Sequence, residues 1–149
     1  MTGRKTVYLF LLCALALTLA TGCGAHRSVI VPENAPKAVG PYSQGIAAGS
    51  FIYTSGQLPL NPATNEMPKG IEAQARQSLD NVKAVVEAAG SDLSKVVKVT
   101  IFLKDLNDFT TVNEIYATYF EGDAPARSCV QVARIPRDAL IEIEAVAIK

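Results

Sequence analysis

The segment 125–148 constrains the fold of this chain more than any other stretch. It contains two apolar β-type runs, joined by a short turn that includes a proline. Charges interrupt this pattern: Arg127 stands at the start of the first run, and Glu142 and Glu144 lie inside the second. Carboxylates in so apolar a strand are costly to bury unless another group pairs with them or uses them. A solvated edge strand accommodates any one such charge, but three of them beside Cys129 favour a functional site.

The overall composition indicates one globular domain preceded by a leader. The chain has 149 residues, of which 49% are hydrophobic and 19% charged, enough to bury a sizeable core. Basic and acidic residues number 14 each, and without residues 1–22 there remain 12 basic and 14 acidic residues. No basic block is interleaved with aromatic residues, so we expect no nucleic-acid partner. His26 is the only histidine and no Cys/His cluster has metal-ligand spacing, so we expect no metal site.

Residues 1–22 have the layout of a secretory signal peptide. A charged start precedes an apolar run over residues 7–17, which is shorter than the ~20 apolar residues that a membrane-spanning helix needs. The following sequence LATGCG resembles the bacterial lipoprotein signal box, in which Cys23 would be lipidated and become the new N-terminus. Ala20 stands where that box most often has leucine. We therefore expect an exported, membrane-anchored lipoprotein, and ordinary secretion with cleavage nearby is the alternative.

The cysteines then leave a single free thiol in the mature chain. Cys13 would be removed with the leader, and Cys23 would be blocked by lipid. Cys129 remains, so no intramolecular disulfide is possible. Residues 23–31 would form a tether between the lipid and a domain over residues 32–149.

The apolar pattern after the leader predicts strands, helix, strand, helix, strand, strand. The proline-rich stretch 29–44 permits at most a short edge strand. The expected elements are strands 45–48 and 51–57, a helix over 71–89, a strand over 96–103, a helix after Asp108, and the two strands of segment 125–148. Gly90 would end the first helix and Asp108 would cap the second. This order is typical of an α+β sandwich built on two βαβ crossovers.

Three amides lie at informative positions on the predicted helices. Gln74 and Asn81 fall outside the apolar stripe of the first helix, whereas Asn113 falls on or beside the stripe of the second. An amide at such a position needs hydrogen-bond partners. An internal hydrogen bond and a contact with a ligand satisfy Asn113 equally well.

The second face of the predicted sheet lacks a cover of its own. Two helices can cover only one face. Yet strand 96–103 is apolar on both faces, with Val97, Val99, Ile101 and Leu103 on one and Val96 and Phe102 on the other. Strands that are apolar on both faces need both faces covered. We therefore expect other copies of the chain to cover the second face.

Several motifs resemble the Rid (YjgF-type) family of enamine/imine deaminases. They are ENAPKAVGPYSQG, TSGQLPLNP, QARQSLDNVKAVVEAAG, FLKDLNDF, PARSCV and IEIEAVAI, and the match runs from about Pro32 to Ile148. The resemblance implies an α+β fold of the chorismate-mutase-like type, with a mixed sheet, two helices on one face and a homotrimeric assembly. In that fold the last strand lies antiparallel between the two strands that flank the first helix. The nearly continuous apolar content of residues 141–148 favours this central position over a simple hairpin.

The resemblance also implies a reaction. The family hydrolyses small 2-imino acids such as 2-iminopropanoate and 2-iminobutanoate, which arise from 2-aminoacrylate and its homologues, to 2-keto acids and ammonia. It uses no cofactor, and its clefts lie between subunits. Its substrate-carboxylate arginine, water-orienting glutamate and pocket cysteine match Arg127, Glu142 and Cys129, and its other pocket positions match Tyr42, Ser55, Gly56 and Asn113.

The residue types suit this chemistry. The planar guanidinium of Arg127 can hold a carboxylate bidentately, which lysine cannot. Glu142 and Glu144 are two residues apart on a strand, hence on one face and ~6.6 Å apart. Mutual repulsion in a partly dry site should raise the pKa of one of them, which makes it a better acceptor for a proton from water. Cys129 is at least as well explained as a small buried apolar side chain as it is by a chemical role.

Two other readings of the sequence remain. A trimer with the same arginine could bind small acids or proteins without turnover, although Arg127, Glu142, Ser55 and Asn113 together favour an enzyme. Endoribonuclease activity, proposed for some relatives, would need a basic surface that is absent here.

Two features depart from the common pattern of the family. The short segment before Pro125 leaves the size of the cleft open, and the leader would export the enzyme to a place with no obvious source of imine.

Overall fold

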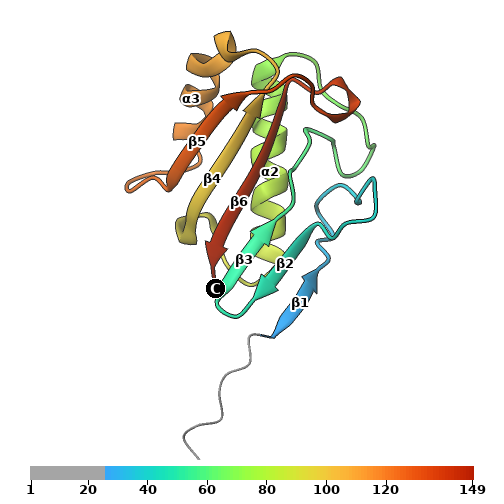
Figure 1. The fold of residues 1–149 in the computed structure, drawn as a ribbon, viewed down its shortest axis with the longest axis vertical. Helices are drawn as coiled ribbons and strands as arrows, with labels where there is room; N and C mark the ends of the chain where they lie inside the picture. Colours follow the sequence, from blue (N-terminus) through green and yellow to red (C-terminus); the bar gives the residue numbers. More distant parts are fainter. Residues whose placement is uncertain (1–25) are drawn as a thin grey trace, which may run out of the picture.

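The computed structural model describes residues 26–149, which form a six-stranded mixed sheet with two helices across one face (Figure 1). The elements are β1 (Arg27–Ile30), β2 (Gly45–Ala48), β3 (Phe51–Thr54), α2 (Ile71–Ala88), β4 (Val96–Leu103), α3 (Phe109–Ala117), β5 (Ala126–Gln131) and β6 (Ile141–Ile148). Short 3-10 turns precede β4, α3 and β6. No helix within residues 26–149 is long and apolar enough to cross a membrane.

Strand β6 lies in the middle of the sheet, as expected. The strand order is β1-β2-β3-β6-β4-β5, with β6 antiparallel to both β3 and β4 and with β4 parallel to β5. In Figure 1, β6 runs between β3 and β4. Its alternate residues Ile141, Ile143, Ala145 and Ala147 are buried against the helices. The α+β architecture with two helices on one face is therefore confirmed.

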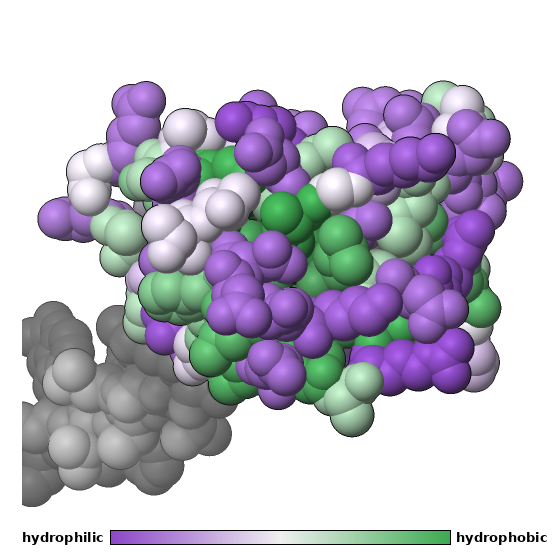
Figure 2. Space-filling model, turned by 90° about the horizontal axis from the view of Figure 1, so that it is seen from above, coloured by the Kyte–Doolittle hydropathy of each residue, from purple (hydrophilic) through white to green (hydrophobic). Residues whose placement is uncertain are grey.

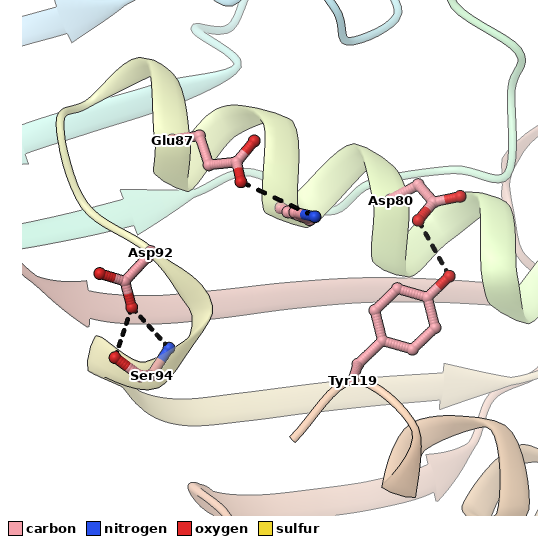
Figure 3. A network of polar contacts seen from close by, with 6 residues as sticks. Asp80, Glu87, Asp92, Ser94 and Tyr119 are labelled. Atoms are coloured by element: carbon pink, nitrogen blue, oxygen red, sulfur yellow. Dashed lines mark hydrogen bonds and ion pairs between the residues drawn. The ribbon is translucent and has the colours of Figure 1, made fainter. Parts of the chain in front are cut away.

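Helix α2 supplies most of the core that covers this face. Its buried stripe includes Leu79, Val82 and Val86, and each such side chain contributes about 1.5–3 kcal/mol on burial. Tyr119, just after α3, donates its hydroxyl proton to Asp80 of α2 at 2.9 Å and so links the two helices within their common layer (Figure 3). The same figure shows the carboxylate of Asp92 capping the 3-10 turn before β4.

Two amides of α2 that we expected outside the core are buried. Asn81 donates to the carbonyl oxygens of Leu58 and Leu60, both at 2.9 Å. Gln74 accepts from the backbone N–H of Leu140 at 2.8 Å. These bonds fasten the loops after β3 and before β6 to the helix layer.

The face of the sheet opposite the two helices, here called the open face, is partly covered by the chain's own loops. Leu58, Leu60, Ile135 and Ala139 form a second apolar cluster, and Phe102 packs against it. Loops of the same chain therefore partly cover Phe102, whereas Phe51 and Tyr53 remain 45% exposed, so the expected cover by other copies stays a prediction. Figure 2 shows the molecule from above, turned by 90° from the view of Figure 1. On that side, hydrophobic side chains lie in patches between larger hydrophilic areas.

Strand β4 differs from its expected alternation at its start. A β-bulge between Val96 and Lys98 places Val96 in the core and leaves Val97 41% exposed. The assignment of Val97 to the same face as Val99 was therefore wrong, because a bulge adds one residue that breaks the two-residue period.

Two element boundaries also differ from the predictions. Asp108 makes no side-chain cap because a 3-10 turn runs directly into α3, and Asp105 caps that turn by accepting from the N–H of Asn107 at 2.9 Å. Strand β1 begins at Arg27, inside the segment 23–31 that we expected to be a tether, because residues 27–30 pair with β2. The signal peptide and Cys23 lie outside the described residues.

Candidate functional site

Four of the expected site residues meet on the open face of the sheet. Tyr42, Ser55, Gly56 and Glu142 line a hollow of about 230 Å³, together with Val39, Leu58 and Pro136. Glu142 projects from β6, and Ser55 and Gly56 directly follow β3. The structure therefore assembles residues about 100 positions apart in the sequence into one cleft, because β6 pairs with β3.

Hydrogen bonds from Ser55 hold the wall of this cleft. Its N–H donates to the carbonyl oxygen of Gln44 at 2.9 Å, and its hydroxyl donates to that of Ser43 at 2.6 Å. The side-chain amide of Gln44 donates to the carbonyl of Pro36. The hydroxyl of Tyr42 accepts from the N–H of Val39 at 3.2 Å. The loop before β2 is thus fixed against the end of β3, with Tyr42 as part of the wall.

Gly56 lies so close to Glu142 that a side chain at residue 56 would force the carboxylate to move. A Cβ atom added to Gly56 would stand 1.8 Å from the Oε1 atom of Glu142. The absence of a side chain at residue 56 therefore makes room for the carboxylate. No periodicity in the sequence signals this contact.

The pKa of the Glu142 carboxyl is raised above its ordinary value. Burial is the main cause, and the negative charge of Glu144 on the same face adds to it. The expected direction is confirmed, although repulsion between the two carboxylates is the smaller contribution. A carboxylate with a raised pKa is a stronger acceptor for a proton.

Arg127 and Asn113 meet on the other side of the sheet, beneath α3. The Nη2 atom of Arg127 donates to Oδ1 of Asn113 at 2.6 Å. The guanidinium carbon lies 4.5 Å from the centroid of the Tyr116 ring and 5.7 Å from that of Phe109. No carboxylate within residues 26–149 forms a salt bridge with Arg127. The guanidinium is therefore held in place by neutral groups and keeps its charge available for an anion.

The surroundings of Cys129 are those of a small apolar residue. Cys129 lies two residues after Arg127 on β5, pairs with Ile101 and packs against the core. Burial raises the pKa of its thiol, and the charge of Arg127 only partly opposes this. A thiol with a raised pKa stays protonated near neutral pH and is a poor nucleophile.

Within one chain, Arg127 and Glu142 point to opposite faces of the sheet. Arg127 pairs with Val99 of β4, and Glu142 pairs with Phe102. Positions 99 and 102 are an odd number of residues apart, so their side chains alternate to opposite faces. The structure thus contains two partial sites, one with Glu142, Tyr42, Ser55 and Gly56, and one with Arg127, Asn113 and Cys129.

Sequence reasoning missed the aromatic residues around Arg127. Phe109 and Tyr116 lie four residues before and three residues after Asn113, hence on the same face of α3. Apolar residues at this spacing predict a core stripe of the helix, so their contact with a charged group was not expected. The helical spacing that they share with Asn113 was the one signal in the sequence that could have indicated this contact.

Within the part of the chain that the structure describes, no group of three or more His, Cys, Asp or Glu residues could hold a metal ion.

Comparisons with known proteins agree on the family. The family model described as "Endoribonuclease L-PSP" matches residues 32–149. The 2-iminobutanoate/2-iminopropanoate deaminase of Escherichia coli K12 is 60% identical over 123 residues, which cover 80% of this chain and 96% of that protein.

Solved structures show the same fold. The E. coli YjgF gene product has a TM-score of 0.79 at 57% identity, covering 82% of this chain and 98% of that one. The E. coli TdcF structure with bound serine has a TM-score of 0.80 at 50% identity, covering 82% of this chain and 98% of that one. RidA from an Antarctic Psychrobacter species has a TM-score of 0.80 at 43% identity, covering 82% and 99% of the two chains. The chain therefore belongs to the endoribonuclease L-PSP family, which is the Rid family that its motifs resemble.

Proposed function

We propose that the protein hydrolyses small 2-imino acids, such as 2-iminopropanoate and 2-iminobutanoate, to 2-keto acids and ammonia. The observation that carries this proposal is the guanidinium of Arg127, which forms no salt bridge within residues 26–149 and is ordered beside Asn113 and two aromatic rings. The 60% identical E. coli protein, named as a deaminase of these two compounds, indicates the reaction. No cofactor enters the reaction that we propose.

Arg127 is the proposed anchor for the substrate carboxylate. A guanidinium has five N–H donors, and Asn113 accepts from one of its nitrogen atoms. The remaining donors can bind a carboxylate in a bidentate manner. The E. coli TdcF structure holds serine, a small amino acid with such a carboxylate.

Glu142 is the proposed acceptor for a proton from the attacking water. The water oxygen bonds to the imine carbon as the C=N π electrons move to nitrogen, and Glu142 takes the water proton. Return of that proton to nitrogen gives a neutral carbinolamine, which carries a hydroxyl and an amino group on the same carbon. Glu142 then takes the remaining hydroxyl proton and passes it to the amino nitrogen, so that the C–N bond breaks, ammonia leaves and the carbon–oxygen double bond of the keto acid forms. Burial and Glu144 both favour the protonated form of Glu142, which suits a group that accepts and then returns a proton.

A complete site of this kind needs more than one chain. Arg127 lies on the edge strand β5, and Glu142 faces the opposite side of the sheet. We therefore propose a homotrimer in which Arg127, Asn113 and Cys129 of one subunit face Glu142, Tyr42, Ser55 and Gly56 of the next. Exposed apolar residues on the open face, including Phe51, Tyr53 and Ile148, are suited to such contacts.

We also propose that the protein is exported and anchored to a membrane by lipid on Cys23. The charged start, short apolar run and LATGCG sequence support this proposal. Cleavage without lipidation is the competing outcome.

The proposed reaction can be tested with a leaderless protein that begins at Gly24, so that β1 stays intact. 2-Iminopropanoate is generated in the cuvette by an amino acid oxidase, and its loss is followed with and without the protein. Faster loss at catalytic protein concentrations is expected. Saturable binding of pyruvate without any acceleration would instead favour a binding module, and cleavage of RNA under the same conditions would favour a ribonuclease.

A further inference from the structure

One face of α3 surrounds the Arg127 guanidinium. Phe109, Asn113 and Tyr116 are spaced by four and three residues, which places them in a row on the helix. Asn113 accepts the single hydrogen bond that the Arg127 side chain donates within residues 26–149, at 2.6 Å. Tyr116 makes the closer of the two ring contacts, at 4.5 Å against 5.7 Å for Phe109. Such distances are within the range in which a ring attracts a cation.

The ring of Tyr116 is itself fixed. The residue is 6% exposed, and its ring centroid lies 4.5 Å from that of Phe120. Its hydroxyl is buried and has no hydrogen-bond partner within residues 26–149. Burial raises the pKa of this hydroxyl to about 12 although the charge of Arg127 opposes the shift. The hydroxyl is therefore not a useful acid or base near neutral pH, and it is the ring face that meets Arg127.

We propose that Tyr116 is a positioning residue for Arg127. The ring of Tyr116 holds the Arg127 guanidinium in a plane from which its remaining N–H groups point to the substrate carboxylate. This inference rests on the proposed function, in which Arg127 binds that carboxylate. Arginine has a long, flexible side chain, and ordering it during binding would weaken affinity. The ring and Asn113 impose that order before the substrate arrives. Neither group neutralises the charge, as a carboxylate partner would.

Changing the electronic character of the ring at nearly constant shape tests the proposal. In the first step, Tyr116→Phe keeps the ring and removes the unpaired hydroxyl. We expect KM for 2-iminopropanoate to change less than about twofold, and thermal stability to be equal or higher. Fluorine atoms are then added to the ring of this phenylalanine, which withdraws electron density from its face. We expect KM and the pyruvate dissociation constant to rise stepwise, by about three- to tenfold in all, while kcat stays within about twofold.

Tyr119 provides the matched control. It lies three residues further along the chain, and its hydroxyl bonds to Asp80 rather than meeting Arg127 (Figure 3). The same fluorinated series at Tyr119 should leave KM and the pyruvate dissociation constant unchanged. A purely structural role for Tyr116 predicts changes in thermal stability without the stepwise loss of carboxylate binding.

Two results would overturn the inference, and they are distinguishable. If Arg127→Ala weakens pyruvate binding but fluorination at Tyr116 does not, Arg127 is the anchor and Tyr116 does not position it. If Arg127→Ala leaves both binding and turnover unchanged, the proposed anchor fails and the positioning role fails with it. Oligomeric mass and circular dichroism on each sample identify variants that do not fold.

Discussion

The carboxylate of Glu142 occupies the space that a side chain on Gly56 would need. A Cβ atom at residue 56 would lie 1.8 Å from Oε1, far inside any real contact. Glu142 also projects from the central strand β6, whose backbone is paired on both sides and cannot shift easily. The two residues are therefore coupled, and a change at one is felt at the other.

We expect Gly56→Ala to lower kcat on the order of a hundredfold, because a displacement of about 1 Å in a catalytic group can have that effect. Steady-state imine hydrolysis measures this. Thermal unfolding of Gly56→Ala, Glu142→Ala and the double variant completes the test. In the Glu142→Ala background the added methyl group has no carboxylate to meet, so Gly56→Ala should lose most of its destabilising effect there. Additive effects would show that the two side chains do not compete for one space.

The pH dependence of the reaction should reflect the raised pKa of Glu142. Protonation removes the acceptor for the water proton, so kcat/KM should fall with decreasing pH, at a pH above the ordinary pKa of a glutamate. Glu144→Gln removes one of the two causes of the shift. Loss of a neighbouring negative charge lowers a carboxyl pKa, and the acid limb should therefore move to lower pH. Burial is the larger cause, so part of the shift should remain. An acid limb that stays in place or moves upward would contradict the assignment.

The central position of the last strand followed from the family resemblance, and the composition of β6 supported it against a simple hairpin. The run IEIEAVAI is apolar enough to require neighbours on both sides, and a central strand has them. The helix α2 was equally predictable from its apolar steps of three and four. Glu142 and Arg127 stood out because charges within such runs are costly.

Other features depended on contacts that no local pattern encodes. The bulge at Val96–Lys98 changed which valine entered the core. Phe102 is covered by loop residues such as Leu58 and Ile135, which are far from it in sequence. The opposite orientation of Arg127 and Glu142 follows from the register of two different strands against β4. Register is a tertiary property, so the two partial sites could not be separated by inspection of the sequence.

Replacement of Arg127 by lysine separates the effect of its charge from that of its planar shape at the proposed substrate anchor. Lysine keeps the positive charge but loses the planar fork, the bidentate contact and the stacking beneath Tyr116. We expect Arg127→Lys to lower kcat/KM on the order of a hundredfold, close to the loss for Arg127→Ala. The matched control is Arg134→Lys, since Arg134 is exposed and pairs only with Asp138 within the described chain. That variant should keep normal kinetics. Full activity of Arg127→Lys would mean that a point charge is enough.

Lipidation of Cys23 can be tested in cells. Metabolic labelling of the full-length chain with a palmitate analogue should mark the wild type and not Cys23→Ser. Cys129→Ser is the control, because its thiol lies in the folded domain and should not affect labelling. Equal labelling of wild type and Cys23→Ser would rule out this anchor, and an unlabelled but secreted wild type would indicate ordinary cleavage.

The division of the site between two faces of the sheet predicts complementation between inactive variants. Arg127→Ala lacks the proposed anchor but retains Glu142, and Glu142→Gln lacks the proposed proton acceptor but retains Arg127. If each site takes Arg127 from one subunit and Glu142 from its neighbour, a trimer mixed at random at a 1:1 ratio contains both intact residues in about a quarter of its sites. We therefore expect the two variants, unfolded and refolded together, to regain about a quarter of wild-type activity, while each refolded alone stays inactive.

Mass measurement under native conditions, with one variant carrying a small tag, verifies that the trimers are mixed. Sites built within single chains would give mixed trimers without any recovery, because each chain then carries one defective residue in every site. Mixed trimers with no regained activity would therefore overturn the shared-site arrangement, whatever the activity of the wild type.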